Sequence, residues 1–209
     1  MLPKKARPFY RGRVSKGQET KSAILDEALA VASQVGFTGL SIGRLAERTG
    51  MSKSGLFAHF QSKEQLQLQT LAHAKRRFVD TTVRPALTVP RGEKRLRELF
   101  ERWLTWESQT LPGGCIFVTG SVEFDDQPGP MRDALVADQR DWLDTIATVV
   151  EAAVAEGDFR PDLDARQVAF ELQALTLGFH HFARLLGDEH AADHARTAFE
   201  GILERSRAR

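Results

Sequence analysis

The sequence predicts an all-α protein with a small helical domain at the N-terminus and a larger helical domain behind it. Apolar residues recur at the three- and four-residue spacing of helices, and no segment shows the alternation of a β-strand. Serine, glycine and proline stand where these patterns begin and end, as helix caps and turns require. The 209 residues, 42% of them hydrophobic, are enough to form a sizeable core.

Composition limits the classes of protein that fit. No apolar run approaches the roughly 18 residues of a membrane span, and the basic N-terminus lacks the apolar stretch of a signal peptide. A single cysteine, Cys115, excludes an internal disulfide. We therefore expect a soluble, cytoplasmic protein with no membrane partner and no cofactor.

The charge is divided unequally along the chain. Residues 1–80 hold 14 basic and 6 acidic residues, a net charge of +8, whereas residues 81–209 hold 15 and 22, a net charge of −7. A basic first part joined to an acidic second part predicts that only the first part meets a polyanion. A basic arm with no specific partner is the alternative.

The first helix follows a basic arm. Residues 1–16 are rich in Lys, Arg, Pro and Gly and are expected to be flexible. The first helix spans about 17–35, and Gly36 suits its end. Its apolar stripe comprises Ile24, Leu25, Ala28, Leu29, Ala32 and Val35.

Serines mark the starts of the second and third helices. Ser41 can cap a short second helix, and Gly50 suits the tight turn after it. Ser52 can cap a third helix at about 53–60. A helix, a glycine-containing turn and a second helix, supported by a preceding helix, form a helix-turn-helix arrangement.

The fourth helix is expected to connect the two domains. Ser62 opens it, with Gln65 at the reciprocal position of a capping box. It continues to about Val83, and Pro85 is expected to end it.

Further helices are expected in the acidic part of the chain. One follows a glycine-rich break at 111–114, one starts at a Pro-Gly-Pro segment, and one is capped by Asp164. Their expected ranges are about 93–108, 115–124, 130–156, 164–186 and 189–205.

The third helix carries a small, polar outer face. Leu56 and Phe60, four residues apart, fall on one side and are expected to pack on the first two helices. Ser54 and Ala58 lie opposite, and a face this small can enter a major groove about 12 Å wide. Lys53 lies in the first turn, where free backbone N–H groups favour phosphate.

Residues 21–66 resemble the DNA-binding domain of TetR-family transcriptional regulators. The resemblance covers roughly a quarter of the chain. Its segments match in order and spacing without gaps: Ile24-Leu25-Asp26 with Ala28, Gly36-Phe37, Leu40-Ser41-Ile42, Leu45-Ala46-Glu47-Arg48, Gly50-Met51-Ser52-Lys53-Ser54-Gly55-Leu56-Phe57, His59-Phe60, Ser62-Lys63-Glu64 and Leu66.

The resemblance implies an organisation and a set of DNA contacts. A helix-turn-helix domain at 17–66 would be followed by a connecting helix at 67–84 and an effector-binding and dimerisation domain at 85–209. One departure is Phe57, where the family usually has a tyrosine whose hydroxyl reaches phosphate. The residues expected at DNA are Ser41, Arg44, Ser52, Lys53, Ser54, Gly55, Phe57, Ala58, His59 and Lys63.

A TetR-family chain is expected to be a homodimer that represses transcription from a palindromic operator. A small, largely apolar effector would release it by changing the separation or mobility of the two DNA-binding domains, with the fourth helix as the connection. In the family the C-terminal helices enclose a pocket for such an effector, so the resemblance implies that some of the aromatic residues spread over these helices line one, although such residues also form ordinary cores. The expected effector residues are Phe100, Trp103, Cys115, Phe117, Trp142, Ile146, Leu175 and Phe179.

The helix at 164–186 is apolar on two faces and must be covered on both. One set of apolar residues includes Leu175, Phe179 and Leu186, and the opposite set includes Phe170 and Leu177. A second subunit is expected to cover one face, although a central helix of a monomer remains an alternative. The expected dimer interface comprises Val168, Leu172, Phe182, Ala195, Ala198, Phe199 and Ile202.

Three further features leave alternatives open. Cys115 is either a buried apolar residue or a sensor thiol activated at a helix N-terminus. His190 and His194, one helical turn apart, allow a metal site, so a metal-dependent enzyme remains an alternative, as does an enzyme with Cys115 as its nucleophile. A separate alternative is an architectural DNA-binding protein that has no effector. The basic residues of the arm either enter a minor groove or only aid solubility; they are Lys4, Lys5, Arg7, Arg11 and Arg13.

Overall fold

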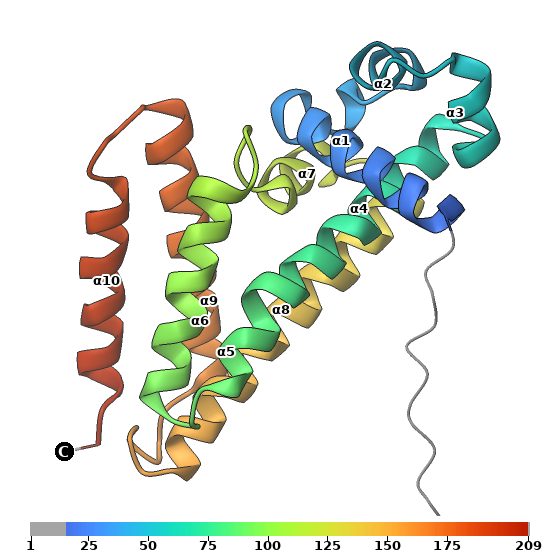
Figure 1. The fold of residues 1–209 in the computed structure, drawn as a ribbon. Coiled ribbons are helices and arrows are strands. Elements are labelled where there is room, and N and C mark those ends of the chain that lie inside the picture. The colour runs from blue at the N-terminus through green and yellow to red at the C-terminus, as the bar shows by residue number, and fades with distance from the viewer. Residues whose placement is uncertain (1–15, 209) are drawn as a thin grey trace, which may run out of the picture.

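A computed structural model describes residues 16–208, so the arm lies outside the described residues. Every regular element within that range is a helix, as predicted (Figure 1). In chain order the elements are α1 (Lys16–Gly39), α2 (Ile42–Thr49), α3 (Lys53–Phe60), α4 (Lys63–Phe78), the π-helical turn η1 (Val79–Val83), α5 (Arg84–Thr88), α6 (Glu93–Thr105), η2 (Trp106–Thr110), α7 (Ile116–Phe124), α8 (Pro130–Ala155), α9 (Ala165–His180), η3 (His181–Leu185) and α10 (Ala191–Ser206).

The helices form a small N-terminal group and a larger C-terminal bundle. Figure 1 shows α1–α3 gathered at one end, α4 running beside α8 from that end into the bundle, and α9 and α10 along the far side. Over residues 16–208, no helix is long and apolar enough to cross a membrane.

The predicted caps are confirmed. The hydroxyl groups of Ser41, Ser52 and Ser62 accept backbone N–H groups at the starts of α2, α3 and α4, and the carboxylate of Asp164 does the same for α9. Gly50 ends α2 in the left-handed conformation, with φ at 69°. These local interactions fix the helix boundaries close to their predicted positions.

The first helix is interrupted at Gly36, where a stop is predicted. Gly36 has φ 74° and ψ 170°, and one more helical stretch follows it to Gly39. The carboxylate of Glu123, from α7, accepts the N–H of Phe37 and the hydroxyl of Thr38, both at 2.7 Å. A side chain on Gly36 would collide with this carboxylate, because its Cβ would lie 1.8 Å from Glu123 Oε1.

The prediction that Pro85 ends the fourth helix is wrong. The chain stays helical through η1 and α5 to Thr88, with Pro85 in the first turn of α5. Proline offers no N–H to the Thr81 carbonyl four residues earlier, and Arg102 Nη1 donates to that oxygen instead, at 3.3 Å. The π-helical turn thus carries the helix past the proline, and the connecting helix is longer than predicted.

The predicted dimer interface needs correction. Five of its seven residues are buried in the chain's own core, because that face of α9 packs on α8 and that face of α10 packs back on the bundle; they are Val168, Leu172, Ala195, Phe199 and Ile202. Phe182 and Ala198 remain exposed. The uncovered apolar face of α9 and η3 carries Phe170, Leu177 and Leu185.

Candidate nucleic-acid interface and ligand cavity

The outer face of α3 is bare, as the sequence predicts. Leu56 and Phe60 are fully buried beneath it. Lys53, Ser54 and Ala58 are exposed, as is Phe57, at 56% exposure. A large aromatic side chain this exposed beside small polar residues is a feature of a contact surface rather than of a core.

The start of α3 is held by its own polar groups. Ser52 Oγ accepts the N–H of Gly55 at 3.1 Å and lies 3.2 Å from Ser54 Oγ. A Cβ at Gly55 would lie 3.2 Å from the same oxygen, so glycine leaves the cap undisturbed. At α2, Ser41 caps the N–H of Arg44, whose side chain is exposed.

Two of the residues predicted to contact DNA are less available: His59 is only partly exposed, and Lys63 already makes a hydrogen bond within the chain. His59 is half-buried, with its ring 6.2 Å from that of Phe60. Lys63 Nζ donates to the backbone carbonyl of Thr38 at 2.6 Å, so its ammonium joins α4 to the end of α1.

The helix-turn-helix group is tied to the bundle through the loop before α7. The N–H of Gly113 donates to Ser33 Oγ of α1 at 3.1 Å, in a buried position. A Cβ at Gly113 would lie 1.7 Å from the Ser33 carbonyl oxygen, so the loop backbone rests directly on α1. Together with Glu123, this contact links α1 to the C-terminal domain.

The fourth helix makes a second connection to α1. Gln67 Nε2 donates to the Phe37 carbonyl at 2.7 Å, in a buried position. Further along α4, two side chains contact Asp26 of α1: His73 Nε2 lies 2.8 Å from Asp26 Oδ1, and Arg77 Nη1 donates to the same oxygen at 2.9 Å. A movement of α4 would therefore move α1 and the helices packed on it.

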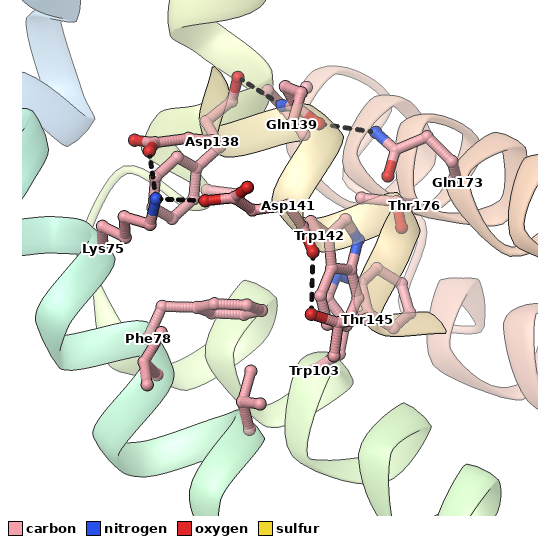
Figure 2. A pocket seen from close by; sticks show the side chains of 15 residues that line it. Lys75, Phe78, Trp103, Asp138, Gln139, Asp141, Trp142, Thr145, Gln173 and Thr176 are labelled. Atoms are coloured by element: carbon pink, nitrogen blue, oxygen red, sulfur yellow. Dashed lines mark hydrogen bonds and ion pairs between the residues drawn. The ribbon is translucent and has the colours of Figure 1, made fainter. Parts of the chain in front are cut away.

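A cavity of about 90 Å³ lies where α4 passes α8 (Figure 2). Its walls come from α4, η1, α6, α7, α8 and α9. The lining residues are Lys75, Phe78, Val79, Val83, Trp103, Cys115, Phe117, Val118, Asp138, Gln139, Asp141, Trp142, Thr145, Gln173 and Thr176.

The structure divides the predicted effector residues into three groups. Trp103, Cys115, Phe117 and Trp142 line this cavity. Phe100 and Ile146 line a much smaller space deeper in the bundle, and Leu175 and Phe179 border an open groove between α9 and α10.

The sequence reasoning missed the polar wall of the cavity. Lys75 Nζ lies 2.8 Å from Asp138 and 2.6 Å from Asp141 (Figure 2). Hydrogen bonds to the two carboxylates raise the pKa of Lys75, so it stays charged at neutral pH. Burial raises the pKa of Asp138, against the opposing effect of Lys75. A signal of this polar wall was present in the sequence, because Asp138 and Asp141 are three residues apart and share a helix face with Trp142.

Cys115 is a buried residue of the cavity wall rather than an activated thiol. Burial, and after it the neighbouring carboxylate of Glu107, raises the pKa of the Cys115 thiol well above its ordinary value. A sensor or a nucleophile needs the opposite shift, because the thiolate is the reactive form.

We expect Cys115 of the native chain to react with iodoacetamide at pH 8 at least about 100-fold more slowly than in the urea-unfolded chain. The rates can be followed by mass spectrometry of the intact protein. Comparable rates in the two states would restore the sensor-thiol interpretation.

The two histidines that allowed a metal site are not joined by further ligands among residues 16–208. His190 and His194 are both exposed, with ring centroids 6.5 Å apart. Among residues 16–208, no three His, Cys, Asp or Glu side chains are grouped to hold a metal ion.

Two family models match the chain. Residues 24–70 match the bacterial regulatory proteins of the tetR family, and residues 92–199 match the tetracyclin repressor-like C-terminal domain, which alone spans more than half of the chain. The chain belongs to the TetR family of DNA-binding transcriptional regulators. This assigns the bare face of α3 to a regulator's helix-turn-helix domain.

Similar sequences and structures are also transcriptional regulators. The HTH-type transcriptional regulator RutR of Escherichia coli O157:H7 is 27% identical over 169 residues, which cover 78% of this TetR-family chain and 74% of RutR. A TetR transcriptional regulator from Chloroflexus aurantiacus superposes with a TM-score of 0.84 at 28% identity, covering 93% and 99% of the two chains. A putative regulator from Saccharomonospora viridis, solved with choline, gives 0.76 at 26% identity and covers 91% and 99%.

Proposed function

We propose that this TetR-family regulator is a homodimeric, cytoplasmic repressor that leaves a palindromic operator when a small molecule enters the cavity between α4 and α8. One observation carries the proposal: α4 contacts both functional regions. Lys75 forms part of the cavity wall, while Lys63 and Gln67 of the same helix hold the end of α1. The structure of the Saccharomonospora viridis regulator with choline supports a small-molecule effector.

The proposed contacts with DNA lie on α3 and at the start of α2. Lys53, Ser54, Phe57 and Ala58 are placed to enter a major groove, with Phe57 against a thymine methyl rather than a phosphate. Arg44 is placed to reach a phosphate. Lys63 would join them only after leaving the Thr38 carbonyl.

The proposed dimer forms through the uncovered apolar face of α9 and η3. Phe170 and Leu185 are exposed at 67% and 73%, and a monomer in water rarely leaves such residues grouped on one side. The groove between α9 and α10 adds Phe182 and Ala198 to the surface. A dimer places two α3 helices in successive major grooves, about 34–36 Å apart for half-sites one turn apart.

A variant with a filled cavity tests the link between effector and DNA. Thr145 lines the cavity, and Thr145→Phe is expected to occupy it while leaving α3 unchanged. A labelled duplex bound by the wild-type chain is titrated with a library of small amines, alcohols and carboxylates in an anisotropy assay. We expect the wild type to be released by at least one class and the variant to bind DNA equally but to stay bound. Equal release of both proteins would contradict the proposal.

A further inference from the structure

The charges at the cavity do not balance. One ammonium, that of Lys75, faces the two carboxylates of Asp138 and Asp141. Glu107 is fully buried beside Cys115; its Oε2 lies 3.4 Å from His180 Nδ1, and its Oε1 has no hydrogen-bond partner. At Lys75 one ammonium thus faces two carboxylates, and this local excess of negative charge favours a cationic ligand over an anionic one.

A relay of amide groups leaves a hydrogen-bond acceptor at the cavity. The Phe117 carbonyl can only accept, so Gln139 turns Nε2 toward it, at 3.5 Å, and toward Ser121 Oγ, at 3.1 Å. Gln139 Oε1 then faces Gln173, which must donate through its own Nε2 at 3.5 Å. This leaves Gln173 Oε1 buried without a partner, ready to accept an N–H or O–H group.

Aromatic rings supply most of the remaining wall. The ring of Phe78 lies 5.1 Å from that of Trp142 and 5.8 Å from that of Phe117, and all three line the cavity. Aromatic rings attract cations, most strongly where water is excluded. Trp103 adds a buried indole N–H without a partner, which suits an oxygen elsewhere on the same ligand.

The cavity is small. Its volume of about 90 Å³ is below the ~150 Å³ of a cavity that admits the six carbons of benzene, so the part of a ligand that it encloses has fewer than about six non-hydrogen atoms.

We propose that the effector is a small organic ammonium ion, which takes over the carboxylates of Asp138 and Asp141 from Lys75. The inference rests on the proposed function, since it names the effector class for the same cavity. Lys75 acts as a tethered cation that links α4 to α8 while the cavity is empty of ligand. A ligand ammonium beside the same carboxylates repels Lys75, which frees α4 to move with α1.

A series of probes on one carbon frame isolates the charge. The full-length chain, without DNA, is titrated calorimetrically with butylammonium, butan-1-ol and butanoate, whose four-carbon frame is small enough for the cavity. We expect the ammonium to bind at least about tenfold more tightly than the alcohol, and the carboxylate to bind most weakly. An alcohol or carboxylate that binds equally or more tightly, or an ammonium that does not bind at millimolar concentration, overturns the proposal.

Two substitutions of carboxylates identify the contact. Asp138→Asn and Asp141→Asn each keep the side-chain shape, and Asp141 is exposed enough for its variant to fold. We expect each to weaken the ammonium at least about fivefold and to change the alcohol less than twofold. Glu151→Gln, an exposed carboxylate on the same helix, is the matched control and is expected to change neither. Unchanged ammonium affinity in both aspartate variants contradicts the assignment.

Removal of the Lys75 ammonium tests whether the ligand displaces it from Asp138 and Asp141. We expect Lys75→Met to bind the ammonium more tightly than the wild type, because the competing charge is gone, whereas Lys94→Met, at an exposed lysine of α6, leaves the affinity unchanged. Weaker binding in Lys75→Met would overturn the displacement. Since these titrations omit DNA, an ammonium that binds but releases no duplex would instead count against the proposed function.

Discussion

Gly113→Ala is expected to lower the free energy of unfolding by about 3 kcal/mol. The added Cβ would lie 1.7 Å from the carbonyl oxygen and 2.0 Å from the carbonyl carbon of Ser33, and neither backbone atom can turn away. The loop must leave α1, which also breaks the buried hydrogen bond from Gly113 to Ser33. Urea unfolding followed by circular dichroism measures the change.

Gly17→Ala is the matched control for this effect. Gly17 lies in the first turn of α1, and a Cβ there would meet nothing within 4 Å. Alanine at this position is expected to leave stability unchanged or to raise it by less than about 1 kcal/mol. Equal stabilities of the two variants would mean that the loop before α7 does not rest on α1.

Lys53→Glu is expected to reduce DNA affinity by about 100-fold or more. Each subunit of a dimer loses one phosphate contact and gains a repulsive charge, and two such losses of about 1.4 kcal/mol each make a factor of 100. Folding is not expected to suffer, because Lys53 is exposed and glutamate is favourable in the first turn of a helix. Anisotropy titration of a labelled duplex at several salt concentrations gives both the affinity and its salt dependence.

The control for this variant changes the same charge elsewhere. Lys94→Glu alters an exposed lysine of α6 and is expected to weaken binding less than threefold. In Lys53→Glu, the slope of log affinity against log salt is expected to become shallower by about one per subunit. A slope that stays the same would mean that Lys53 contacts no phosphate.

The helix-turn-helix domain was predictable because its determinants are local. Ser41, Ser52 and Ser62 cap the helices that follow them within three residues, and the spacing of Leu56 and Phe60 alone decides which face of α3 is buried. Interactions of this range can be read from neighbouring residues in a sequence.

The errors concern contacts between distant segments. Periodicity showed that α9 is apolar on two faces, but not which face α8 covers, so Val168 and Leu172 were placed at the wrong surface. Pro85 was expected to end a helix because proline has no N–H to donate. The guanidinium N–H that donates to the Thr81 carbonyl in its place belongs to Arg102, 21 residues further along the chain.

The polar part of the cavity was missed for the same reason. Lys75 and Asp141 are 66 residues apart and would be taken for solvated surface charges on separate helices. The aromatic residues Trp103, Phe117 and Trp142 were found because large rings must be buried somewhere in a bundle. Which of the buried rings border a cavity depends on how the helices cross.

Selection of bound duplexes from a pool of random DNA tests the central claim, that the bare face of α3 in a dimer reads DNA, most directly. The full-length chain is expected to enrich sequences with two-fold symmetry and half-site centres one helical turn, or a multiple of it, apart, and the Lys53→Glu chain is expected to enrich none. Enrichment of the same sequences by both chains, or the absence of any enriched sequence with the wild type, would contradict the account.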